Sequence, residues 1–204
     1  RYLYISSLNA DPRSIGKYLK SKGKAEDYLL TETSSFCNVT IFRPSIVFGE
    51  CDSFFNKFAT LLKIFPIFPL ACPHSKFMPV YVEDLTDHMI DTIGNIKTYN
   101  TKIDVTGPNE YTFRELIEHT LQALKIKRVI IPLNNFLSKI QALVFQNLPG
   151  KLFTMDNYQS LQVDSCSDDG FKGSSSLEDI IPHYLNIKTK QKRFENLRKR
   201  SGRG

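Results

Sequence analysis

The sequence predicts an α/β fold, in which strands and helices alternate along the chain around a parallel sheet. A short apolar run at residues 2–6 is followed by a helical stretch and then by a second apolar run at residues 39–42. This order is typical of a strand, a crossover helix and a parallel strand. The alternation continues to about residue 185, and the hydrophobic content of 41% is enough for a packed core.

The individual elements are predicted from apolar periodicity and from turn and capping residues. Helices are expected over residues 14–32, 54–64, 85–93, 113–124, 136–148, 155–161 and 177–185, and strands over 2–6, 39–42, 77–82, 102–106 and 129–132. Thr112 and Glu115 have the spacing of a capping box. Asp84 is placed to cap the helix that follows it, from which Leu85, Met89, Ile90 and Ile93 are expected to point inward. The proline-rich residues 65–73 are expected to form a loop.

The predicted helix over residues 136–148 carries a broad apolar stripe. Its members are Phe136, Ile140, Leu143, Val144 and Leu148. We expect this stripe to pack against the core of the region formed by residues 51–187. The alternative is an amphipathic face that docks on a membrane surface together with a basic tail.

The net charge of +6 is concentrated at the end of the chain. Residues 188–204 hold eight Lys or Arg and a single acid, Glu195, so the rest of the chain is close to neutral. We expect a solvated, disordered tail, with anionic lipid or an acidic partner as the alternatives. No nucleic-acid partner is expected, because Phe194 is the tail's one aromatic residue for stacking on bases.

The four cysteines and four histidines are scattered without a metal-binding spacing, so no metal site is predicted and a reducing compartment is expected. No apolar stretch reaches the roughly 20 residues that a spanning helix needs, and no signal peptide is visible. The sequence therefore predicts a soluble or membrane-peripheral protein.

Tyr18 and Lys22 form the clearest candidate for chemistry. Spaced four residues apart on a predicted helix, their side chains project from one face. An ammonium group beside a phenol favours the phenolate, so such a pair can move a proton on or off a hydroxyl or carbonyl. Ser6, at the end of the first strand, can hold the reacting oxygen.

Five patterns follow one another along the chain: Ile5 to Ala10, Tyr18-x-x-x-Lys22, Arg43 to Gly49, Pro79 to Asp84, and Gly107-Pro108 followed by Tyr111 to Leu116. With these patterns in this order, the chain resembles the extended or atypical short-chain dehydrogenase/reductase family. It is most similar to the branch that contains the 39-kDa accessory subunit of respiratory complex I and its bacterial relatives. The resemblance extends to about residue 185.

The resemblance implies an NAD(H) or NADP(H) cofactor and a role for each matching residue. Tyr18 would be the acid/base, Lys22 would hold the nicotinamide ribose, and Ser6 would orient the substrate oxygen. Pro44 and Ser45 would line the nicotinamide end through backbone contacts. It remains open whether Ser6, Tyr18 and Lys22 catalyse a reaction or only bind the cofactor.

Two functions follow from the resemblance. The first is a structural or assembly subunit of complex I, peripheral to a membrane. The second is an NAD(P)-dependent epimerase, dehydratase or reductase, of the kind that acts on sugar nucleotides, with Tyr18 and Lys22 in its active site. The expected compartment is a bacterial cytoplasm or a mitochondrial matrix.

The sequence departs from the family in one respect, since it has no Gly-x-x-Gly-x-x-Gly turn for the cofactor's pyrophosphate. We therefore expect the C-terminal part of a Rossmann-type parallel sheet plus a small mixed α/β substrate-side region, with the N-terminal half encoded upstream. Residues 1–50 would end the nucleotide-binding domain, 51–187 would form late core elements and the substrate-side subdomain, and 188–204 the tail. Weak or no nucleotide binding is expected for this chain alone.

Overall fold

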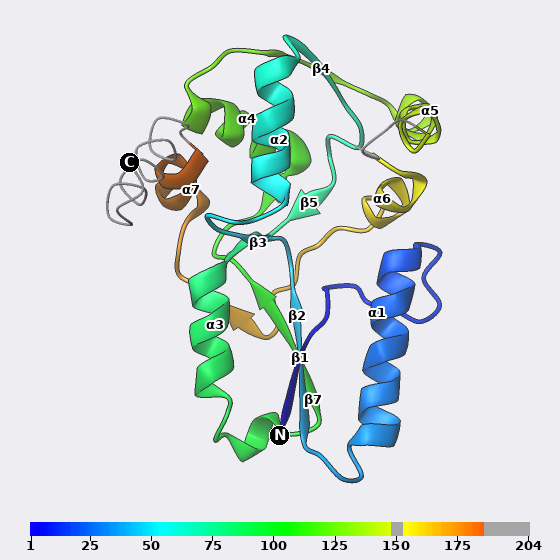
Figure 1. Ribbon diagram of the computed structural model, residues 1–204, viewed down its shortest axis with the longest axis vertical. Helices are drawn as coiled ribbons and strands as arrows, with labels where there is room; N and C mark the ends of the chain where they lie inside the picture. The colour runs from blue at the N-terminus through cyan, green and yellow to red at the C-terminus, as the bar shows by residue number, and fades with distance from the viewer. Residues whose placement is uncertain (148–152, 186–204) are drawn as a thin grey trace, which may run out of the picture.

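A four-stranded parallel sheet forms one end of the molecule, with a helix on each of its faces (Figure 1). The computed structural model describes residues 1–147 and 153–185. The strands run in the order β1 (Tyr2–Ile5), β2 (Val39–Pro44), β7 (Thr101–Thr106) and β10 (Phe171–Lys172). Helices α1 (Lys17–Tyr28) and α3 (Val82–Asp91) lie on opposite sides of it. The predicted α/β class with a parallel sheet is confirmed.

The predicted strand, helix and strand at the start of the chain are confirmed. Strand β1 pairs in parallel with β2, from Tyr2 opposite Val39 to Ile5 opposite Phe42. Helix α1 begins at Lys17, later than expected, because Gly16 before it has an extended backbone. A short π-helical segment, Leu29–Thr33, continues it.

The two faces of the sheet are covered in different ways. On the α3 side, Phe42, Val80, Leu85 and Val105 form a small apolar cluster. Helix α1 instead buries Leu19, Gly23 and Glu26, so a carboxylate lies where an apolar side chain is usual. The contact of α1 with the sheet therefore combines apolar packing with a buried carboxylate.

The larger apolar core lies at the other end of the molecule. Helices α2 (Phe54–Ile64), α4 (Phe113–Leu124) and α7 (Leu177–Leu185) surround it. Two short pairs, β3 (Val47–Phe48) with β6 (Val80–Tyr81) and β5 (Lys76–Phe77) with β8 (Tyr111–Thr112), connect it to the sheet. Its fully buried side chains include Phe48, Phe55, Leu62, Leu116, Ile117 and Ile181. The Thr112–Glu115 capping box at the start of α4 is confirmed.

The expected loop over residues 65–73 is wrong, because this segment contains a strand. Strand β4 (Ile67–Leu70) pairs in parallel with β9 (Val129–Pro132), from Ile67 opposite Val129 to Leu70 opposite Pro132. Prolines are tolerated at sheet edges, where a missing N–H faces away from the partner. In a pair of two strands both members are edges, so Pro69 and Pro132 are compatible with it.

The predicted cap at Asp84 is also wrong. Helix α3 begins at Val82, and the Asp84 carboxylate instead accepts hydrogen bonds from the backbone N and the Oγ of Ser175, each at 2.8 Å. Asp84 therefore ties α3 to the segment that leads into α7. Ile90 and Ile93, expected to point inward from this helix, are 62% and 53% exposed.

The apolar stripe predicted over residues 136–148 faces solvent rather than the core. Helix α5 (Asn135–Phe145) buries Ser138 and Ala142, whereas Phe136 is 72% and Val144 52% exposed. The Ser138 hydroxyl accepts a hydrogen bond from the backbone N of Cys72, which turns this small-residue face inward. Leu148 and the basic tail lie outside the described residues.

Two short helices complete the described chain, α6 (Met155–Ser160) and the 3-10 helix at Ile96–Thr98. None of the helices among residues 1–147 and 153–185 has the length and apolarity to cross a membrane. Within the same residues, no cluster of three His, Cys, Asp or Glu side chains could hold a metal ion.

Candidate functional site

Lys22 lies where the first strand of the sheet ends. Its Nζ donates a hydrogen bond to the carbonyl oxygen of Ile5, the last residue of β1, at 2.9 Å. The same ammonium lies 5.1 Å from the ring centroid of Tyr4, a cation–π contact. Ligands of parallel α/β sheets bind outside the carboxyl ends of the strands. Lys22 is therefore held at the edge where a ligand is expected.

Tyr18 lies one turn before Lys22 on the same unbroken helix, so the expected i, i+4 arrangement is confirmed. The side chain is 47% exposed, and its hydroxyl makes no hydrogen bond with any other residue that the structure describes. The pKa of the nearby Tyr4 is raised by burial and, to a lesser extent, by Glu26, Tyr2 and Tyr18. Tyr4 is therefore a neighbour of both Tyr18 and Lys22.

The start of α1 is capped by a residue far away in the sequence. The carboxylate of Asp156, on α6, accepts hydrogen bonds from the backbone N of Lys17 and of Tyr18, the latter at 3.3 Å. Gly16 has no side chain that could satisfy these groups. A negative charge is also favourable at the positive end of the helix dipole. Asp156 thus links the position of Tyr18 to the second half of the chain.

Ser6 lies in a buried ionic network rather than beside Tyr18. It is 3% exposed, and its Oγ donates to Oε1 of Glu26 at 2.5 Å. Glu26 also accepts from Arg43 Nε at 2.9 Å and from Lys102 Nζ at 2.9 Å. Burial alone would raise the pKa of Glu26, but the hydrogen bonds from Arg43, Ser6 and Lys102 hold it below its usual value. The network fastens α1 to β1, β2 and β7.

Ser7 is a candidate that the sequence reasoning missed. It is half-buried, and its hydroxyl makes one weak local hydrogen bond, to the carbonyl of Leu8 at 3.3 Å. The Ser6 hydroxyl is committed to Glu26, so Ser7 is the freer hydroxyl at this strand end. Glu26, one helical turn after Lys22, was the signal in the sequence. A carboxylate on the inner face of this helix needs a hydrogen-bond donor, and the Ser6 hydroxyl supplies one.

Pro44 and Ser45 are buried at the end of β2. The Pro44 carbonyl accepts from the backbone N of Leu8 at 2.9 Å. The Ser45 hydroxyl donates to the carbonyl of Ser165 at 2.7 Å and accepts from the backbone N of Met78 at 3.3 Å. The structure thus brings Ser6, Lys22 and Pro44 to neighbouring strand ends, and uses the Ser45 side chain to fasten two later loops to them.

The chain is similar in sequence to several known proteins. No family model matches the chain. It is 33% identical over 121 residues to the rat protein NADH dehydrogenase (ubiquinone) 1 alpha subcomplex subunit 9, mitochondrial (Rattus norvegicus), covering 58% of this chain and 31% of that protein. The subunit of the same name from Arabidopsis thaliana is 24% identical over 200 residues, covering 91% of this chain and 48% of that protein. The chain therefore spans less than half the length of these relatives.

Solved structures show the same fold at low identity. The dTDP-glucose 4,6-dehydratase of Bacillus anthracis, in complex with NAD, has a TM-score of 0.60 and 15% identity, covering 95% of this chain and 62% of that chain. The UDP-glucose 4-epimerase of Thermotoga maritima has a TM-score of 0.60 and 13% identity, covering 94% and 63%. The chain thus has the fold of the dTDP-glucose 4,6-dehydratase and the UDP-glucose 4-epimerase, and it is similar in sequence to subunit 9 of the NADH dehydrogenase (ubiquinone) 1 alpha subcomplex.

Proposed function

We propose that this chain belongs to an NAD(P)(H)-binding subunit that has a structural or assembly role in respiratory NADH:ubiquinone oxidoreductase, complex I. The similarity to the complex I subunits, which covers 91% of the chain in the plant relative, carries this proposal. The relatives are mitochondrial by name, so we infer a mitochondrial location, on the matrix side and peripheral to the inner membrane.

The residues at the strand ends fit the nicotinamide side of a dinucleotide. Lys22 offers an ammonium whose position is fixed by Ile5 and Tyr4, suited to hydrogen bonding with ribose hydroxyls. Pro44 and Ser45 offer buried backbone beside it. A bound dinucleotide would supply hydride chemistry. The chain's own part is to hold the ribose with Lys22 and to keep a hydroxyl, Tyr18, exposed next to it.

Native gel electrophoresis tests the proposed partner. The tagged natural-length protein, expressed in its own cells, is expected to migrate with assembled complex I, and its depletion is expected to lower the amount of that complex. A protein that migrates only as a free species, with unchanged complex I after depletion, would contradict the proposal.

An NAD(P)-dependent epimerase, dehydratase or reductase is the second candidate. The exposed Tyr18 side chain favours it, because a hydroxyl with no hydrogen bond to another described residue is available to a substrate. The burial of the Ser6 hydroxyl against Glu26 counts against the triad as first assigned, since that hydroxyl cannot orient a substrate while it is held there.

Replacing Tyr18 separates the two functions. For an enzyme, Tyr18→Phe is expected to lower turnover by at least about 100-fold, since a positioned acid/base contributes roughly 10²–10⁴-fold. Nucleotide affinity is expected to change little, because the ring and Lys22 remain. Tyr28→Phe, on the same helix and 64% exposed, is the control. Unchanged turnover in Tyr18→Phe, or no turnover with any nucleotide sugar, leaves the structural role as the function.

A further inference from the structure

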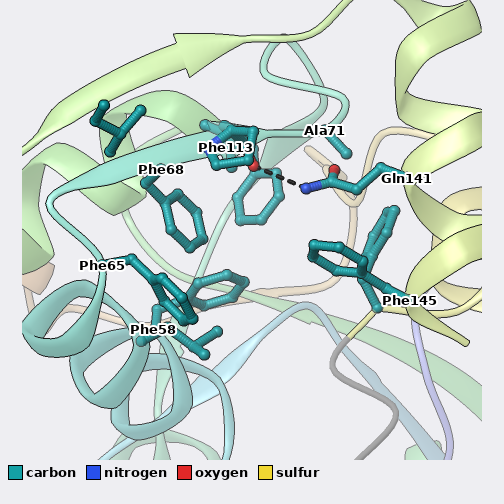
Figure 2. Close-up of a pocket in the computed structure, with 12 residues that line it drawn as sticks. Phe58, Phe65, Phe68, Ala71, Phe113, Gln141 and Phe145 are labelled. Atoms are coloured by element: carbon teal, nitrogen blue, oxygen red, sulfur yellow. Dashed lines mark hydrogen bonds between the residues drawn. The ribbon is translucent and has the colours of Figure 1, made fainter. Parts of the chain in front are cut away.

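A cavity of about 360 Å³ lies between residues 58–71 and residues further along the chain, and no residue of α1 lines it. Helix α2, strand β4, the start of α4 and helix α5 enclose it. Six of the twelve residues that line it are phenylalanines: Phe58, Phe65, Phe68, Phe113, Phe145 and Phe153. Figure 2 shows Phe58, Phe65, Phe68 and Phe113 on one side and Phe145 facing them across the space. We call it the phenylalanine cavity.

None of the described residues that line the phenylalanine cavity has a charged side chain. A phosphate or carboxylate entering it would lose its hydration without gaining a Lys or Arg partner, which is costly. An apolar group is favoured instead, and apolar cavities of about 150 Å³ already bind benzene. At about 360 Å³ this cavity is large enough for a fused ring system and lies within the range of small-molecule sites.

One polar side chain, Gln141 of α5, contributes to the wall. Its Nε2 donates to the carbonyl oxygen of Pro69 on β4 at 3.0 Å, the dashed line in Figure 2. This bond fixes which end of the amide is the oxygen. The Oε1 atom is buried and has no donor among the described residues. Buried acceptors are nearly always satisfied in folded proteins, so an unpaired one next to a cavity points to a ligand that donates.

We propose that the phenylalanine cavity binds the uncharged aromatic part of a small molecule that carries one hydroxyl or N–H group, with Gln141 Oε1 as the acceptor. Rotation about the soft terminal torsion of Gln141, which releases Nε2 from the Pro69 carbonyl, would present Oε1 to the cavity. The aromatic walls offer edge-to-face contacts to a planar ring. This inference goes beyond the proposed function and requires no bound nucleotide.

The matched probes 2-naphthol and 2-methoxynaphthalene test the proposal, because they share a ring system and differ in the donor. The chain contains no Trp, so the fluorescence of the probe can be followed without interference from indole. Saturable binding of 2-naphthol at one site per chain is expected. The methyl ether is expected to bind about fivefold more weakly, the value of one neutral hydrogen bond. Addition of UDP-glucose is expected to displace neither probe.

Variants locate the binding site. Gln141→Leu is expected to bind the two probes equally well. Leu61→Phe, from a half-buried position on α2 that lines the cavity, is expected to weaken both by at least about tenfold through filling the space. Leu143→Ala, on the exposed side of α5, is the control and is expected to bind like the parent. Circular dichroism confirms that each variant is folded.

Several results would overturn the proposal. These are the absence of saturable 2-naphthol binding, binding unaffected by Leu61→Phe, and a preference for 2-naphthol that persists in Gln141→Leu. Displacement of the probes by UDP-glucose would show instead a nucleotide-sugar site.

Discussion

Glu26 fastens α1 to the sheet through a buried ionic network. It is fully buried and receives three hydrogen-bonding side chains, from Ser6, Arg43 and Lys102. A buried carboxylate is tolerated only when it is paired in this way. The sequence offered Ser6 as a catalytic hydroxyl, but it could not show that this hydroxyl is occupied, because its partner lies 20 residues away on a different element.

Replacing Glu26 by Gln is expected to destabilise the fold and to change its pH dependence. Removing one partner of a buried ion pair typically lowers the free energy of unfolding by about 3–5 kcal/mol. At about pH 7 we expect a loss near the lower end of this range, because Arg43 and Lys102 are partly exposed. The folded-state pKa of Glu26 is lowered from its usual 4.5. The stabilisation is therefore complete above about pH 4.5 and is lost as the pH falls through the folded-state pKa.

Urea unfolding of the parent, Glu26→Gln and the exposed control Glu32→Gln at about pH 7 and about pH 3 checks this prediction. The difference in free energy of unfolding between the parent and Glu26→Gln should be smaller at the lower pH. A difference that stays constant with pH, or that is within about 0.5 kcal/mol at about pH 7, would show that the network contributes little.

Gly23 allows α1 to lie close to the turn that precedes it. A Cβ atom built there would be 2.3 Å from the backbone C of Asp11 and from the N of Pro12. In an exposed helix, Gly→Ala gains about 1 kcal/mol. Here the clash is expected to reverse the sign, with a net loss of about 1–3 kcal/mol. Thermal unfolding of Gly23→Ala is compared with that of Gly94→Ala, because a Cβ atom at position 94 has no other atom within 4 Å. A stabilised Gly23→Ala would refute the close contact.

At the scale of elements, α1 is held at its start by Asp156 of α6. Asp156→Ala is expected to cost about 1 kcal/mol of local stability, as for other helix caps. Amide hydrogen exchange at Lys17 and Tyr18 should become about fivefold faster. The exposed Asp168→Ala, whose side chain is 97% exposed, serves as control. Unchanged exchange at these two amides would mean that the carboxylate does not cap the helix.

Elements with strong local signals could be predicted from the sequence, and those decided by distant partners could not. Helix α2 has the predicted bounds, residues 54–64, and the Thr112–Glu115 capping box forms as its spacing indicates. Strand β4 was missed because its pairing partner lies about 60 residues further on, at β9, and its prolines read as loop. The α5 stripe was misjudged because Ser138 and Ala142, rather than the larger residues, form its inner face.

At the scale of the whole molecule, the edge of the sheet at β1 lies next to the candidate nucleotide site. Strand β1 is at the edge of the sheet among the described residues, with Tyr2 46% and Ile5 44% exposed. An exposed, partly apolar edge of this kind favours pairing with a further strand. The solved relatives are longer, since this chain covers 62% and 63% of two of them. In the proposed function this chain holds the nicotinamide end of the cofactor, and a strand paired with β1 would lie beside that site.

The helical arrangement of Tyr18 and Lys22 and the strand-helix-strand order around them could be predicted from the sequence. The details could not. The cap from Asp156 and the contact between Lys22 and Ile5 join residues that are distant in sequence, and no local pattern encodes either of them.

The central claim is that Lys22 binds the nicotinamide side of the cofactor, and equilibrium titration of the natural-length protein with NADH and NADPH tests it most directly. The parent is compared with Lys22→Met and with the control Lys20→Met, from the exposed side of the same helix. Lys22→Met is expected to weaken binding of the preferred nucleotide about 10- to 100-fold, the value of a charge-assisted hydrogen bond, while Lys20→Met binds like the parent. Absence of binding in the parent, or equal affinity in parent and Lys22→Met, would contradict a nicotinamide site at the end of β1.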